Sequence, residues 1–129
     1  MGQRLTPKRA SVVDILAAAS RPLTIPEVLA AGAGLAQSSV YRNLVILEEA
    51  GIVHRIVTSD EFARFELAEE LTGHHHHLIC TNCGRVEDVP ASSHLEASLA
   101  DAIGEIDAAT GFRTKAHRID LVGLCRRCS

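Results

Sequence analysis

The stretch SSVYRNLVILEEAGIVHRIV, residues 38–57, passes from a helical pattern to a strand-like pattern. Val40, Leu44 and Leu47 recur at spacings of three and four residues, as on the buried face of a helix. Gly51 follows this segment and is suited to end the helix in the left-handed conformation. The stretch therefore predicts a helix that runs directly into a strand.

Polar residues stand at the start of this helix. Ser38 or Ser39 can cap it by accepting a hydrogen bond from a backbone N–H of the first turn. Tyr41 and Arg42 lie partly on the face opposite the buried positions. Such a helix start can reach base edges and phosphates of DNA, although an ordinary surface helix would show the same pattern.

Two further helices are predicted before residue 38. Thr6 and Pro7 suit the N-cap and first position of a helix over 8–19. Residues 24–27 form a capping box, with Thr24 as the cap and a glutamate three positions later, before a short helix.

After residue 51, segments 52–57 and 62–67 alternate as two strands of a hairpin joined by the polar turn 58–61. Three short helices and a hairpin predict a winged helix-turn-helix. Segment 68–73 is polar and is expected to be a hinge.

Beyond the hinge, short strands are predicted at 78–80 and 85–89, a helix at 94–110 and a last strand at 114–124. The apolar residues of this helix are expected to face inward; they are Leu95, Leu99, Ala102, Ile103 and Ile106. The predicted class is α+β, with a small α/β domain built on an antiparallel sheet. The expected organisation is a DNA-binding domain over 1–67, a hinge over 68–73 and a second domain over 74–129.

The 129 residues suffice for one compact unit or two small domains of about 60 residues each. Residues 1–58 carry six basic and four acidic side chains, while residues 59–129 carry seven and twelve. Only the first half could approach a polyanion. No secretory signal and no membrane-spanning segment are visible, so a cytoplasmic location is expected.

The four cysteines form two CxxC pairs, Cys80 with Cys83 and Cys125 with Cys128. Two such turns supply the four thiolates that a tetrahedral Zn²⁺ ion requires. Redox chemistry or buried apolar cysteines are the alternatives, but no cysteine is left over and reduced thiols in the cytoplasm favour metal. The filled coordination sphere predicts a structural zinc site.

Four consecutive histidines, 74–77, lead into Cys80. In an extended chain, alternate side chains point to opposite sides, so this run can serve two metal sites. The expected partners are His54 and Glu66 from the hairpin, Glu96 from the long helix and His117 from the last strand. Such ligands suit Zn²⁺, Fe²⁺, Mn²⁺ or Ni²⁺, whereas a solvated polar tract is the alternative.

These motifs resemble those of the ferric uptake regulator (Fur) family of metal-dependent repressors. The resemblance covers nearly the whole chain and is carried by LTPKR at 5–9, SVYRNL at 39–44, AGIV at 50–53, FEL at 65–67, and HHHHLICTNCG at 74–84. It implies a winged-helix domain, a hinge and an α/β dimerisation domain, acting as a homodimer on double-stranded DNA operators. No membrane and no small organic substrate are implied.

The resemblance also implies roles for particular residues. The DNA-contacting set is Arg4, Ser38, Ser39, Tyr41 and Arg42; the first regulatory site is His54, Glu66, His75 and His77; the second is His74, His76, Glu96 and His117. Many iron-type members take a ligand from a histidine near the second helix, where this chain has SRPL at 20–23. His54 is expected to supply this ligand of the first site instead. In the second site, His94 is an alternative to Glu96.

The sensed metal stays open between Fe²⁺ and Zn²⁺. Glu66 resembles iron-type members, because many zinc-sensing members have a cysteine there, while His54 stands where zinc-type members carry an aspartate ligand. Two other functions remain. HLE at 94–96 followed by CRRC at 125–128 superficially matches a zinc deaminase signature, but Leu124 stands where that signature has proline, and Cys80 and Cys83 would have no role, so an enzyme is not expected. A zinc-stabilised DNA-binding module without metal sensing is the second.

Overall fold

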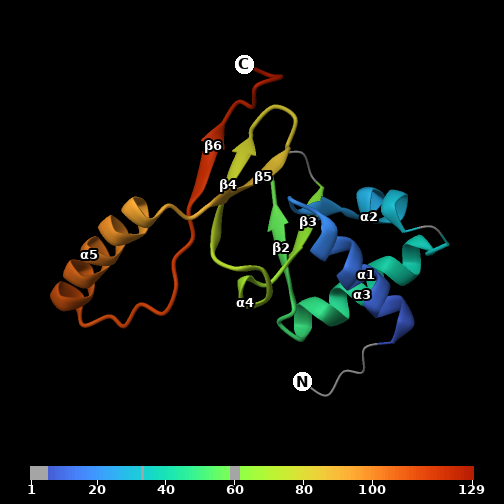
Figure 1. Cartoon of the computed structure of the whole chain (residues 1–129), viewed down its shortest axis with the longest axis horizontal. Helices are drawn as coiled ribbons and strands as arrows, with labels where there is room; N and C mark the ends of the chain where they lie inside the picture. The colour runs from blue at the N-terminus through green and yellow to red at the C-terminus, as the bar shows by residue number, and fades with distance from the viewer. Residues whose placement is uncertain (1–5, 33, 59–61) are drawn as a thin grey trace.

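The computed structural model describes residues 6–32, 34–58 and 62–129. Its first part contains three helices, α1 (Pro7–Ala18), α2 (Ile25–Ala31) and α3 (Gln37–Glu49), which gather on one side of the molecule in Figure 1. They pack around a core of aliphatic side chains and one phenylalanine: Val12, Leu16, Leu23, Val28, Val40, Leu44, Leu47, Val53, Phe65 and Leu67. The three predicted helices are confirmed.

The helix starts agree with the sequence in two cases and differ in one. Thr6 caps α1, and Thr24 forms the capping box with Glu27 at the start of α2. The predicted cap of α3 by Ser38 or Ser39 is wrong: its N-cap is Ala36, which offers no side-chain acceptor. The helix begins earlier than predicted, so both serines lie within its first turn.

The end of α3 is fixed as the sequence predicts. Gly51 has φ 79°, and its N–H donates to the carbonyl of Glu48 at 3.0 Å. The N–H of Ile52 donates to the carbonyl of Leu47 at 3.0 Å. This pair of hydrogen bonds is a Schellman motif, and it sets the angle at which the chain leaves α3 toward the wing.

A three-stranded antiparallel sheet completes the first part. The strands β1 (Leu23–Thr24), β2 (Val53–Val57) and β3 (Ala63–Leu67) lie in the order β1-β3-β2. The wing hairpin is therefore confirmed, although its tip at 59–61 lies outside the described residues. Glu66 lies directly opposite His54 in the β2–β3 register.

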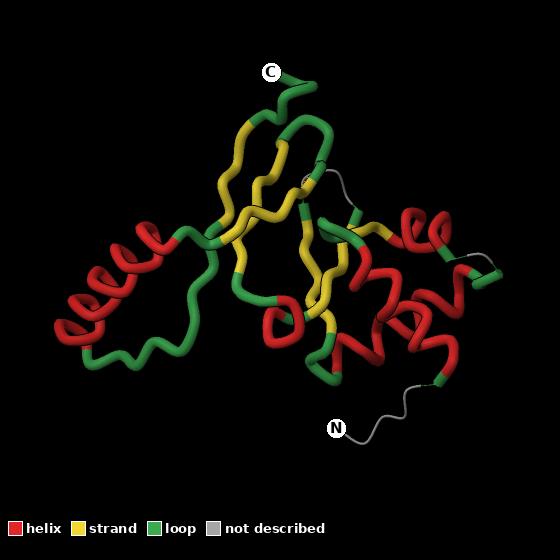
Figure 2. The backbone as a smooth tube through the Cα atoms, in the orientation of Figure 1, coloured by secondary structure: helices red, strands yellow, loops and turns green. Residues whose placement is uncertain are grey.

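The second part of the chain is built on another three-stranded sheet (Figure 2). Its strands are β4 (His75–Cys80), β5 (Val86–Pro90) and β6 (Asp120–Gly123), in the order β5-β4-β6. The β4–β5 pair is antiparallel as expected, but β6 runs parallel to β4, so this sheet is mixed. The α+β class stands.

Three local predictions change. The expected hinge contains a single helical turn, α4 (Glu69–Thr72). The last strand is shorter than 114–124, because residues 111–119 form a connection without strand pairing. The long helix α5 (Ser93–Thr110) has no buried residue, so the expected inward face is wrong for the single chain. Figure 1 shows α5 projecting away from the sheets.

Among the helices of the described segments, none is both long and apolar enough to cross a membrane.

Candidate metal centres

The four cysteines lie together at one end of the second sheet. Cys80 ends β4, and the parallel pairing of β6 with β4 carries Cys125 and Cys128 back to the turn that holds Cys83. Their sulfur atoms all lie within 4.8 Å of one another. All four are free thiols in the structure.

The local backbone favours a thiolate at this position. The N–H groups of Cys83 and Cys125 point at Sγ of Cys80, at 3.5 and 3.4 Å, and lower the pKa of this thiol to about 6. Gly84 allows the tight turn after the first pair, with φ 77°. Four neighbouring sulfur donors, one of which ionises easily, fit Zn²⁺, which prefers thiolates in tetrahedral sites.

The odd and even histidines of the run point to different clusters, because β4 is extended. His74 and His76 join Glu96 of α5 and His117, with all four ligand atoms within 4.8 Å of one another. Nε2 of His76 lies 2.7 Å from Oε2 of Glu96, and Nε2 of His117 lies 2.8 Å from Oε1. His94, the competitor for this position, is exposed on α5 and is outside the group.

The other cluster contains Glu66, His75, His77 and Asp88, again within 4.8 Å of one another. The carboxylate of Glu66 lies between two imidazoles, with Oε2 2.9 Å from Nε2 of His75 and Oε1 2.9 Å from Nε2 of His77. Oδ1 of Asp88 is buried without a hydrogen-bond partner and lies 3.7 Å from both nitrogens. An orphaned carboxylate oxygen among imidazole nitrogens fits a divalent cation.

The ionisation of this cluster is set by its own members. Burial opposes the charge of His75 and His77, but hydrogen bonds and the charges of Glu66 and Asp88 outweigh it and raise the pKa of both histidines. Burial would raise the pKa of Glu66, yet the same histidines lower it. Burial and the nearby Glu66 raise the pKa of Asp88.

His54, expected as the fourth ligand of this cluster, is not in the group. It lies on β2 opposite Glu66. Its side chain is exposed and lines a cavity of about 420 Å³ that Glu66, His75 and His77 also line. The structure places Asp88 of β5 in that position instead. Sequence reasoning missed Asp88, although the antiparallel β4–β5 register pairs it with His77.

Further carboxylates touch the outer nitrogens of two histidines. Asp120 of β6 lies with Oδ1 3.3 Å from Nδ1 of His77. Glu69 of α4 lies with Oε2 2.7 Å from Nδ1 of His74. Metal-ligating histidines commonly use their second nitrogen in this way, so these contacts prepare the inner nitrogens as ligands.

The candidate DNA-contacting residues lie on α3, and Arg4 lies outside the described residues. Tyr41 and Arg42 are exposed, as is Ser38, while Ser39 is half-buried. A free helix face of this kind is open to a partner.

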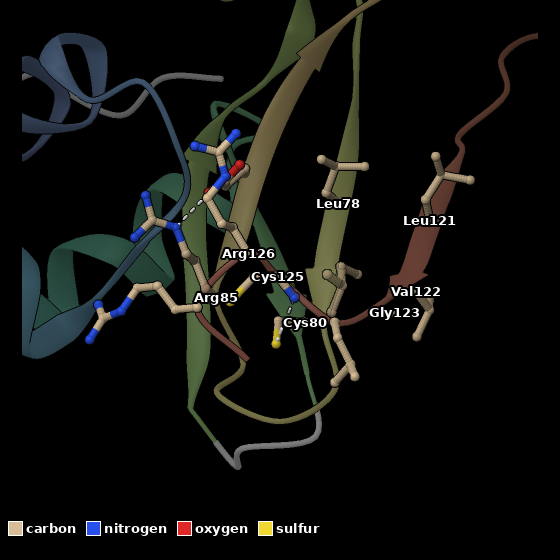
Figure 3. A pocket seen from close by; sticks show the side chains of 12 residues that line it. Leu78, Cys80, Arg85, Leu121, Val122, Gly123, Cys125 and Arg126 are labelled. Atoms are coloured by element: carbon tan, nitrogen blue, oxygen red, sulfur yellow. Dashed lines mark hydrogen bonds and ion pairs between the residues drawn. The ribbon is translucent and has the colours of Figure 1, made fainter. Parts of the chain in front are cut away.

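A second cavity, of about 580 Å³, adjoins the cysteine site (Figure 3). Leu78 of β4 and Leu121 and Val122 of β6 line it with apolar surface, and Arg126 lies at its edge. All three apolar side chains are exposed in the single chain.

The model of the ferric uptake regulator family matches residues 1–122. The peroxide operon regulator of Bacillus subtilis is 30% identical over 99% of this chain and 86% of the relative. The ferric uptake regulation protein of the same organism is 36% identical over 71% of this chain and 59% of its own length.

The ferric uptake regulator of Helicobacter pylori, described as having three functional metal-binding sites, has the same fold with a TM-score of 0.76. It is 24% identical, and the match covers 98% of this chain and 83% of that one. With its winged helix, its cysteine site and its two histidine clusters, the chain belongs to the ferric uptake regulator family of metal-dependent regulators.

Proposed function

We propose that this protein is a cytoplasmic, homodimeric repressor that binds operator DNA when loaded with metal and controls metal homeostasis genes. One observation carries the proposal: Glu66, at the end of the wing hairpin, meets His75 and His77 of β4 and Asp88 of β5 in one cluster. The cluster thus joins the proposed DNA-binding domain, 1–67, to the proposed dimerisation domain, 74–129, across residues 68–73.

The proposed mechanism is a clamp. A bound divalent cation supplies the positive charge that allows two carboxylates and two imidazoles to remain close together. Glu66 would then be held against β4 and β5, and the hairpin that carries it would be held with it. This arrangement favours one orientation of α3 relative to the second sheet. A cation that binds this orientation more tightly than others shifts the population of the protein toward it.

The proposed DNA contacts are made by the start of α3 and the N-terminal arm. Ser38, Ser39, Tyr41 and Arg42 would face the major groove and its phosphates, and Arg4 the adjacent minor groove. The exposure of Tyr41 and Arg42 supports this assignment. In a dimer, two such helices would meet successive half-sites of an operator.

Exposed apolar surface supports the homodimer. Leu95 and Ile106 lie on one face of α5, and Leu121 and Val122 on β6 are exposed as well. Surface of this kind on a helix and an edge strand is typical of a dimer interface that the single chain leaves uncovered. The proposed partner is a second copy of this chain.

The proposed metal is Fe²⁺, with Zn²⁺ as the alternative, and the cysteine site is proposed to hold structural Zn²⁺. The sensory cluster, Glu66, His75, His77 and Asp88, offers two nitrogen and two oxygen donors and no sulfur. This donor set suits iron or manganese as well as zinc. Such a donor set cannot by itself select one of them, because Zn²⁺ binds it at least as tightly as Fe²⁺.

The test is anaerobic binding to DNA selected from a random duplex pool, titrated with buffered Fe²⁺, Mn²⁺, Zn²⁺ and Ni²⁺. Tight binding that appears with one metal in its physiological range would support the proposal and name the metal. Binding that is indifferent to removal of exchangeable metal would instead identify a zinc-stabilised module without sensing. A parallel arm with hydrogen peroxide tests for a response to oxidants.

A further inference from the structure

The second metal cluster, His74, His76, Glu96 and His117, has a polar contact with a residue outside the proposed dimerisation domain. His74 uses both of its ring nitrogens: Nε2 lies 2.9 Å from Oε1 of Glu96, inside the cluster, and Nδ1 lies 2.7 Å from Oε2 of Glu69. Glu69 is the first residue of α4 and is not a member of the ligand group. His74 is thus held between a cluster carboxylate on one side and a hinge carboxylate on the other.

Glu69 is firmly connected to the winged helix. The preceding residue, Ala68, is buried, and its N–H donates to the carbonyl of Ile52 at 2.8 Å. Ile52 in turn donates to Leu47, in the last turn of α3, at 3.0 Å. Two backbone hydrogen bonds therefore lead from the residue beside Glu69 to the end of the proposed recognition helix.

The chain between Glu69 and His74 is short and can change direction. The N–H of Gly73 donates to the carbonyl of Glu69 at 2.7 Å, which closes the turn of α4. Gly73 has φ 93°, a backbone conformation that residues with a side chain rarely adopt. The Glu69–His74 contact therefore spans the point at which α4 gives way to β4.

We propose that Glu69 is a positioning residue that couples the second metal site to the hinge. It orients Nε2 of His74 toward Glu96 and His117, so it supports the affinity of that site. When the site is filled and His74 is fixed, the same contact holds α4 against β4 and stabilises the path to Ile52. The second site then contributes to the orientation of the winged helix, although none of its four ligands belongs to that domain.

This inference rests on the proposed function, because it requires metal to orient the winged helix, and it adds that the second cluster binds metal. It goes beyond it in giving the second cluster its own route to the DNA-binding domain. The first cluster reaches that domain through Glu66 on β3, and the second through Glu69, three residues later. Both metal sites would therefore act on one short stretch of the chain, residues 66–69, where the wing hairpin meets α4.

The experiment uses the full chain with His75→Ala and His77→Ala, which removes two ligands of the first site and leaves the second intact. The cysteine site is filled with zinc, and Co²⁺ is the probe. Glu69→Ala is compared with Glu70→Ala, which removes the same charge from the next position of α4. The exposed side chain of Glu70 makes no hydrogen bond or ion pair among the described residues. Co²⁺ affinity is measured by competition with a chelator, and amide exchange is followed over 68–73 and at Ile52.

Glu69→Ala is expected to weaken Co²⁺ binding by about 10- to 100-fold, the usual effect of losing such a partner. Glu70→Ala should stay close to the unsubstituted background. At saturating Co²⁺, exchange over 68–73 should slow in the background and in Glu70→Ala but not in Glu69→Ala.

Equal Co²⁺ affinity in the two glutamate variants would overturn the positioning role of Glu69. Equal slowing of exchange would overturn the coupling. If the background chain bound no Co²⁺ beyond the cysteine site, the second site itself would fail, and this inference would fail with it. Failure of the second site is distinguishable from failure of the Glu69 role, because it is seen in the background chain before Glu69 is changed.

Discussion

Glu66 and His77 lie eleven residues apart in the chain, yet Oε1 of Glu66 is 2.9 Å from Nε2 of His77. Glu66 belongs to the wing hairpin and His77 to the sheet beyond α4. Their contact closes the loop that contains α4, and His75 and Asp88 complete the cluster around it.

The first prediction concerns the fourth ligand of the sensory cluster. Asp88→Asn should weaken metal binding at this site by at least about tenfold, because the amide cannot supply the charge of the orphaned carboxylate. His54→Ala should have a much smaller effect, because His54 is exposed and lies outside the group. Metal competition titrations on both variants make the comparison.

Glu87→Gln is the control, since Glu87 precedes Asp88 on β5 but pairs with Arg85 at 2.7 Å on the surface. A larger loss of affinity in His54→Ala than in Asp88→Asn would contradict the structural assignment and favour the histidine.

The second prediction concerns pH. The raised pKa values of His75 and His77 mean that the metal-free protein binds protons more tightly than the unfolded chain. Their contribution to stability is complete below the unfolded pKa, about 6.5, and is lost as pH rises through the higher folded values. Metal binding needs neutral imidazoles, so metal affinity should change in the opposite direction and increase over the same range.

Thermal unfolding of the metal-free and metal-loaded protein between about pH 5 and 9 checks both trends. The stabilisation by metal should grow as pH rises through the folded histidine values. A stabilisation by metal that did not change with pH would show that these histidines are not ligands.

Some of this arrangement could be predicted from sequence alone. The CxxC spacing identified the cysteine group, because four thiols in two matching turns have few other uses. The alternation of histidines 74–77 followed from strand geometry, which places neighbouring side chains on opposite faces. Glu66, Glu96 and His117 were expected as partners of the histidine run, the resemblance divided them between two sites, and the structure brings all three to those clusters.

Other features depended on contacts that the sequence does not reveal. Asp88 becomes a neighbour of His77 only through the β4–β5 register, and Glu69 meets His74 only because residues 69–72 form a helical turn. The predicted N-cap of α3 was wrong because the sequence does not distinguish a serine in the first turn from a serine at the N-cap. The apolar stripe of α5 was read as an internal face, but its burial requires a surface from outside the chain.

The third prediction concerns the cysteine site. Cys125→Ser should lower the zinc content by about one equivalent per chain, since three thiolates hold the ion less well than four. Because the site ties the end of the chain to Cys80, amide exchange should rise over 119–129. The helices of the first part should keep their protection, because their core is separate from this sheet.

Ser129→Ala is the control at the same end of the chain. Unchanged zinc content in Cys125→Ser would contradict a four-cysteine site.

The fourth prediction concerns α5. Ile106→Glu should shift the chain toward monomer, because it places an unpaired charge in the proposed interface; a cost on the order of 2 kcal/mol corresponds to about 30-fold in the dimer dissociation constant. Ala108→Glu adds the same charge to the opposite face of the helix and should leave the dimer intact. Sedimentation equilibrium measures both, and equal weakening by the two variants would show that this face is not the interface.

The most direct test of the central claim compares operator binding by the unsubstituted chain and by a His75→Ala, His77→Ala variant, each titrated with the metal that supports binding. His94→Ala is the matched control, because His94 is exposed on α5 and lies outside the three groups. The clamp predicts that metal increases DNA affinity in the unsubstituted chain and in His94→Ala, and that the double variant loses most of this metal dependence, with only the contribution of the second site remaining. Unchanged metal dependence in the double variant would contradict the clamp.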